Sequence, residues 1–143
     1  MRKLFLSLLC LAATICTATV TTVPTFIQKN YRGEVTVIFN PREGNKGMLN
    51  AKQCYAHTGV TYNGTSWQKC GTWRDGLEKY RMTKNADGNW ELHITPNIHT
   101  YYGVADDIEV TQLCFVFNDG PDGSLEGKTA SGGDYFVDLY DSG

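Results

Sequence analysis

The residues best suited to binding chemistry lie in the segment 54–73, CYAHTGVTYNGTSWQKCGTW. It contains His57, Trp67 and Trp73 beside a polar stretch of Gly, Thr, Ser and Asn. An exposed indole offers a flat apolar face, and burying it against the C–H groups of a sugar ring contributes a few kcal/mol at roughly 25 cal/mol per Å². A neutral imidazole can form hydrogen bonds with hydroxyl groups. These residue types favour a site for a neutral, hydroxyl-rich ligand.

A second polar pair, Asn118 and Asp119, follows the apolar run 112–117 and opens the turn NDGPDG. Amide and carboxylate groups also bond to hydroxyls, so this pair joins the histidine and the two tryptophans as candidate ligand-binding residues. Asn, Asp and Gly equally favour plain turns, and tryptophans are often mostly buried. A purely structural role therefore stays open for each candidate.

The sequence contains no familiar catalytic motif. It has no Gly-x-Ser-x-Gly elbow, phosphate loop or His-Glu-x-x-His. A glycosidase needs two carboxylates at a set separation, and the available acids fall at polar or loop positions where carboxylates are common. Neither cysteines nor acids have the spacing of a zinc or calcium site. We therefore expect a protein that is not an enzyme and that uses no metal or cofactor.

The first 18 residues predict a secretory signal peptide. Arg2 and Lys3 give a positive start, an apolar run spans residues 4–16, and small residues precede a cleavage site after Ala18. The run is too short for a membrane span, and a lipid anchor at Cys16 is the weaker alternative. We expect the mature protein to be secreted, periplasmic or on the cell surface.

Charge and cysteine content limit the possible partners. The whole chain carries a net charge of −2, and loss of the signal peptide makes the balance more negative. With no basic stripe, nucleic acid and anionic membranes are not expected partners. Cys54, Cys70 and Cys114 are an odd number, which argues against a disulfide framework. Cys54 and Cys70 could still pair if their strands are neighbours, whereas Cys114 is expected to be buried and free.

Alternating apolar and polar residues predict six short strands separated by turn-forming residues. They span 34–39, 53–57, 80–83, 90–95, 112–117 and 134–140. The Asp87-Gly88 turn between the third and fourth predicts a β-hairpin. Thr95 and Pro96 predict the cap and first residue of a short helical turn ended by Gly103.

Six strands without a sustained helical period predict an all-β fold, an antiparallel immunoglobulin-like β-sandwich. We divide the chain into the signal peptide at 1–18, a lead-in segment at 19–33 and a β-sandwich domain at 34–143. In the lead-in, Pro24 argues against a central strand.

The order of several segments resembles a known family. VTVIF, YAHTGV, KYRMTKN, WELHI, IHTYYGV, FVFNDG and GGDYFVDLY follow one another along the chain. This order resembles a domain of secreted Bacteroidetes proteins that often precedes α-amylase-type catalytic domains. It is similar in layout to the starch-binding modules of carbohydrate-binding families 25 and 26.

The resemblance implies a non-catalytic module that binds α-glucan, as a polysaccharide or oligosaccharide, and that cooperates with a separate glycoside hydrolase. In those modules a histidine on the second strand and a tryptophan just after it hold the sugar, and His57 and Trp67 match them. A later aromatic normally follows the FNDG turn, but residues 121–125 contain none, so Trp73 is the candidate replacement. The alternative is a structural or adhesion spacer with no glycan site. Joint exposure of Trp67 and Trp73 would separate these alternatives.

Overall fold

The structure is a computed structural model that describes residues 18–142. The predicted signal peptide therefore lies outside the described residues except for Ala18. Residues 18–142 contain nine strands, one short α-helix and one 3-10 turn. The elements are β1 (Val20–Val23), β2 (Val35–Phe39), β3 (Cys54–Tyr62), β4 (Thr65–Gln68), η1 (Glu78–Tyr80), β5 (Arg81–Lys84), β6 (Trp90–Ile94), α1 (Ile98–Tyr102), β7 (Val110–Asn118), β8 (Glu126–Gly127) and β9 (Tyr135–Asp138).

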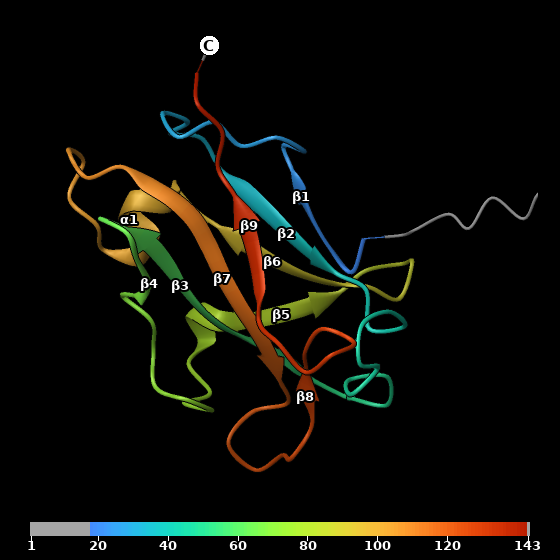
Figure 1. The fold of residues 1–143 in the computed structure, drawn as a ribbon. Helices are drawn as coiled ribbons and strands as arrows, with labels where there is room; N and C mark the ends of the chain where they lie inside the picture. The colour runs from blue at the N-terminus through green and yellow to red at the C-terminus, as the bar shows by residue number, and fades with distance from the viewer. Residues whose placement is uncertain (1–17, 143) are drawn as a thin grey trace, which may run out of the picture.

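The strands form one antiparallel sheet, so the prediction of an all-β fold is confirmed. Their order is β1-β2-β6-β5-β3-β7-β8, with β4 paired to β3 and β9 paired to β7. Hydrogen bonding continues through β5, which pairs with β6 on one side and with β3 on the other. The two layers expected of a sandwich are therefore halves of one curled sheet (Figure 1). The immunoglobulin-like topology stays a prediction.

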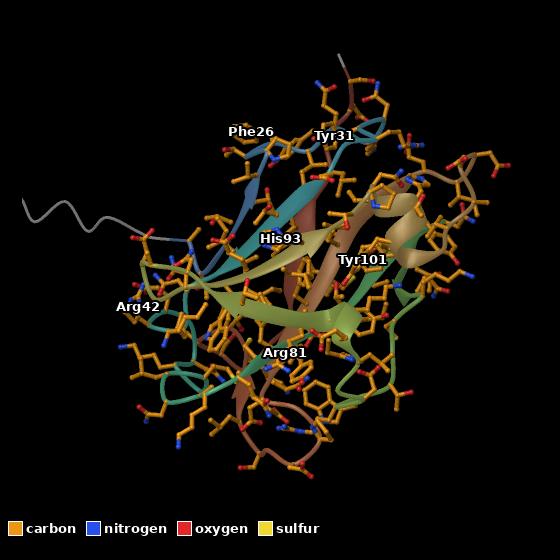
Figure 2. The ribbon with its side chains drawn as sticks, turned by 180° about the vertical axis from the view of Figure 1, so that it is seen from behind. Phe26, Tyr31, Arg42, Arg81, His93 and Tyr101 are labelled. Carbon is orange, nitrogen blue, oxygen red and sulfur yellow. The ribbon has the colours of Figure 1, made fainter. Side chains whose placement is uncertain are left out.

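The core lies between these two halves. Inward side chains alternate along β2, where Val35, Val37 and Phe39 are buried. The ring of Phe39 stacks on that of Phe117 from β7, with centroids 4.0 Å apart. This contact shows that β2 faces β7 across the core. Figure 2 shows the outer side of the half formed by β1, β2, β6 and β5. His93 lies on β6 and Arg81 on β5 in this view.

The strongest sequence patterns correspond to strands in the structure. β2, β7 and the β5–β6 hairpin occupy the predicted positions, and β7 is covered on both faces as expected. The strands β1, β4 and β8 were not predicted. β1 lies in the expected lead-in segment at 19–33 and pairs only with β2, and this edge position tolerates the following Pro24.

The segment 54–73 is more regular than the sequence suggests. We expected a strand ending at His57 followed by a long loop, but β3 continues to Tyr62 and β4 returns antiparallel to it. β-Branched and aromatic residues favour this extension. Asn63 and Gly64, with φ of 49° and 73°, join the two strands. Positive φ at both central residues is what a two-residue type I′ hairpin turn requires.

The helical turn begins later than predicted. Asn97, not Thr95, caps α1, because its side-chain oxygen accepts a hydrogen bond from the backbone N–H of Thr100 at 2.8 Å. Gly103 ends the helix in the left-handed conformation, as expected. No helix among residues 18–142 is long and apolar enough to cross a membrane.

The three cysteines of the described chain are unpaired. Cys114 is buried and free, which confirms the prediction for this thiol. Cys54 faces the core and contacts the sulfur of Met82 at 3.6 Å. Cys70 is exposed and lies over Gly59, on the opposite face of β3. The strand itself therefore separates Cys54 from Cys70, and the disulfide considered between them does not form.

Candidate functional site

Three of the candidate residues meet on the outer face of β3. His57 points outward from this strand, and the ring of Trp67 from β4 stacks on it with centroids 5.2 Å apart and planes inclined by 23°. Trp73 lies in the loop between β4 and η1 (Figure 1) and meets the same imidazole edge-on at 5.1 Å and 84°. The two indoles therefore flank His57 and are steeply inclined to each other.

These rings line an open surface groove of about 340 Å³. Trp73 remains 40% exposed and Trp67 is half-buried, so neither indole plugs the core. The remaining groove residues come from β7, β8, the loop after β4 and the loop between β8 and β9. They are Cys70, Val116, Glu126, Lys128 and Asp134.

A β-bulge directs Trp67 onto the histidine. The β3–β4 register pairs Tyr62 with Thr65 and Val60 with Gln68, so two residues of β4 oppose one residue of β3. Trp67 is one of these two β4 residues and has a φ of 61°. A bulky residue in the left-handed region is a genuine outlier, and bulges commonly re-aim a side chain beside functional sites. Local strain of this kind is consistent with a binding role.

Gly59 lets the chain that carries Trp67 lie directly against β3. A Cβ atom at this position would lie 2.8 Å from the backbone oxygen of Gln68 and 3.1 Å from the Cβ of Cys70. A glycine inside a strand often marks such a close backbone approach. The glycine of the YAHTG segment thus serves the geometry of the groove.

Replacing Gly59 with alanine should move β4 away from β3 and disturb the Trp67–His57 stack. The added methyl group meets backbone atoms, which cannot rotate away, so we expect a loss of about 1–3 kcal/mol in the free energy of unfolding. A denaturant titration measures this loss, and near-ultraviolet circular dichroism reports the indole environment. Unchanged stability together with an unchanged dichroism spectrum would contradict the prediction.

Asp134 holds Trp67 from the other side of the groove. Its Oδ2 accepts a hydrogen bond from the indole Nε1–H at 3.1 Å. Asp134 directly precedes β9 and is 67 positions away from Trp67 in the sequence. Sequence reasoning missed Asp134, because no local pattern indicates a contact between such distant segments.

Arg74 supports Trp73 from behind. Its guanidinium lies 5.4 Å from the indole centroid, within the range of a cation–π interaction. The same group forms an ion pair of 2.7 Å with Asp119 and donates hydrogen bonds to the carbonyl oxygens of Gly120 and Leu125. The candidate residue Asp119 therefore contacts Trp73 only through Arg74 and does not line the groove.

Asn118 also lies outside the groove. It is 2% exposed, and its side-chain oxygen accepts a hydrogen bond from the backbone N–H of Gly120 at 2.9 Å. The Oδ1 atom of Asp119 similarly accepts one from Leu125 N at 3.0 Å. The structure thus brings His57, Trp67 and Trp73 together and places Asn118 and Asp119 in the neighbouring turn.

The imidazole of His57 is held in its neutral form. Burial lowers its pKa below the usual 6.5, although the negative charges of Asp75 and Asp134 oppose this shift. Neither ring nitrogen forms a hydrogen bond with another residue among 18–142. A neutral ring with free nitrogens can both donate to a ligand and accept from it.

This lowered pKa predicts a pH dependence of stability. Between the folded-state pKa and 6.5 the unfolded chain binds more protons than the folded one, so stability rises with pH through this window. The contribution is fully present above pH 6.5 and is lost as the pH falls towards the folded-state pKa. Thermal melts between pH 7 and pH 5 should show this loss, and His57→Gln should make the slope shallower. An NMR titration that gives a His57 pKa above 6.5 would refute the prediction.

The comparisons with known proteins leave the geometry as the basis for a functional assignment. No family model matches the chain, and a search of curated proteins gives no match.

Proposed function

We propose that this protein is a non-catalytic carbohydrate-binding module for starch or a related α-glucan, which it holds between Trp67 and Trp73. The observation that carries this proposal is the pair of surface indoles flanking His57 in one groove. Stacking of a sugar ring on an indole supplies apolar contact area, and the neutral imidazole bonds to hydroxyl groups. The proposal includes export of the protein, which the N-terminal sequence predicts.

The angle between the indoles supports an α-glucan over a flat polysaccharide. Trp67 lies nearly parallel to the His57 ring, whereas Trp73 is nearly perpendicular to it. Successive α-1,4-linked glucose units turn relative to one another, so a curved chain can contact both inclined faces. A ribbon-like β-1,4 chain would contact one indole face at a time. Trp73 thereby takes the role of the late aromatic that residues 121–125 do not supply.

The carboxylates of the groove support a binding role rather than catalysis. Asp134 accepts the indole N–H of Trp67, and Glu126 forms an ion pair of 3.4 Å with Lys128. Each carboxylate thus has a structural partner within the groove, so neither is dedicated to the general-acid role that glycoside hydrolysis needs. Incubation with starch should therefore release no sugar.

Affinity electrophoresis in gels containing soluble starch tests the proposal. We expect starch to retard the protein, and gels with other neutral polysaccharides serve as controls. Isothermal titration with maltoheptaose then gives the dissociation constant. Absence of binding to any α-glucan at millimolar concentration would defeat the proposal.

A second apolar surface favours the alternative of an adhesion or spacer module. Val23, Phe26 and Tyr140 are all exposed, and the rings of Phe26 and Tyr140 meet edge-on at 5.6 Å. Figure 2 shows Phe26 at one end of the molecule. A spacer needs no glycan, so a negative result in the starch gels would leave this alternative in front.

A further inference from the structure

The basic groups of the groove are already engaged by acidic partners. Lys128 lies 3.4 Å from Glu126, and Arg74 behind the groove lies 2.7 Å from Asp119. Each of these cations is paired with one carboxylate, so neither adds a free positive charge to the groove. With His57 neutral, the remaining charge in the groove comes from Asp134.

Asp134 keeps one carboxylate oxygen available. The residue is exposed, and its Oδ2 atom accepts the indole N–H of Trp67. Its Oδ1 atom accepts no hydrogen bond from residues 18–142. Asp75 adds a second negative charge nearby, because both acids act electrostatically on the His57 ring. A ligand in the groove therefore meets two indoles and a net negative charge.

We propose that the groove selects saccharides by charge, binding amine-bearing sugars more tightly than neutral ones and disfavouring anionic ones, with Asp134 as the selecting residue. This inference rests on the proposed sugar-binding role of the same groove. It adds a ligand class, the amino sugars, that contact with neutral hydroxyls alone would not distinguish.

Two interactions favour an ammonium group here. The free Oδ1 atom of Asp134 can accept a charge-assisted hydrogen bond, which is stronger than a neutral one. An ammonium group near an indole face is also attracted by the ring quadrupole, and tryptophan is the best aromatic for this contact. A carboxylate in the same position would be repelled by Asp134. Because the site is open to water, we expect a moderate effect that salt weakens.

A matched series of ligands tests the inference. β-Cyclodextrin, 6-monoamino-6-deoxy-β-cyclodextrin and 6-monocarboxy-β-cyclodextrin differ at one substituent, so titration calorimetry at low salt compares charge alone. We expect the amine to bind roughly tenfold more tightly than the carboxylate, with the neutral ligand between them. The ratio should shrink in 0.5 M NaCl.

Variants assign the effect to one residue. Asp134→Asn can still accept the indole N–H of Trp67 but lacks the charge, so the amine-to-carboxylate ratio should fall to about twofold or less. Asp87→Asn removes the same charge from the exposed β5–β6 turn and should keep the wild-type ratio.

The possible outcomes separate the two proposals. Equal affinity for the three ligands would overturn charge selection and leave the glucan-binding role intact. Binding of the amine alone would support charge selection and count against a neutral α-glucan as the ligand. A ratio that persists in Asp134→Asn would overturn the assignment to this residue. Absence of binding by all three ligands and by maltoheptaose would overturn both proposals.

Discussion

Replacing Trp67 with alanine should weaken maltoheptaose binding by about 2 kcal/mol, or roughly 30-fold in dissociation constant. The indole supplies a flat face in the groove, and its stacking on His57 and hydrogen bond to Asp134 hold it in place before a ligand arrives. Binding to a preorganised ring loses less conformational entropy. Isothermal titration of the purified variant measures the change.

Companion variants make this result specific. His57→Ala should cost less, about 1 kcal/mol, because a hydrogen bond to a hydroxyl exchanges with one to water. Trp73→Ala should weaken binding while leaving the domain folded, since this ring is substantially exposed. Phe26→Ala removes an exposed aromatic that does not line the groove and should leave the affinity for maltoheptaose unchanged. Wild-type affinity in a folded Trp67→Ala protein would refute the stacking role.

Replacing Arg74 with alanine should lower the free energy of unfolding by about 2–4 kcal/mol. The side chains of Arg74 and Asp119 are 15% and 16% exposed, so removing the guanidinium leaves a mostly buried carboxylate without its ion-pair partner. It also removes the hydrogen bonds to the carbonyl oxygens of Gly120 and Leu125. Urea denaturation measures the loss, and binding should weaken as Trp73 loses its support.

A second arginine provides the matched control. Arg81 on β5 is exposed, and its contact with Glu78 is 4.0 Å long. Arg81→Ala should therefore change stability by less than about 0.5 kcal/mol. Equal losses in the two variants would show that the Arg74–Asp119 pair has no special role. Asp119→Asn should fall between them, because it retains an acceptor for Arg74 but not the charge.

The sequence predicted the strands whose periodicity is strong and missed those without it. β2 alternates buried and half-buried residues, and the apolar pattern of β7 fits a strand covered on both faces. β4 is short and has two exposed residues followed by two half-buried ones, so no alternation reveals it. The local signal for this strand is the Asn63-Gly64 dipeptide, which favours a two-residue hairpin turn.

The candidate site was predictable only in part. His57 and Trp67 were found because their residue types suit sugar binding and they lie within one short segment. Asn118 and Asp119 have equally suitable chemistry, but local turn geometry engages their oxygens. Asp134 lines the groove and Arg74 supports Trp73 behind it, both through contacts between distant segments. Such contacts depend on how the sheet curls, which a single sequence does not reveal.

The backbone around the groove implies a trade-off between stability and function. Five non-glycine residues among 18–142 have positive φ, and three of them, Trp67, Lys69 and Arg74, lie in the stretch 67–74 that carries both indoles. Each left-handed residue costs on the order of 1 kcal/mol, which glycine would largely avoid. Glycine at the exposed position 69 should therefore raise stability, whereas glycine at position 67 would also remove the indole with its stack on His57 and its hydrogen bond to Asp134. The strain at position 67 thus persists as long as the groove keeps this indole, and selection for heat resistance would act on the neighbouring positions instead.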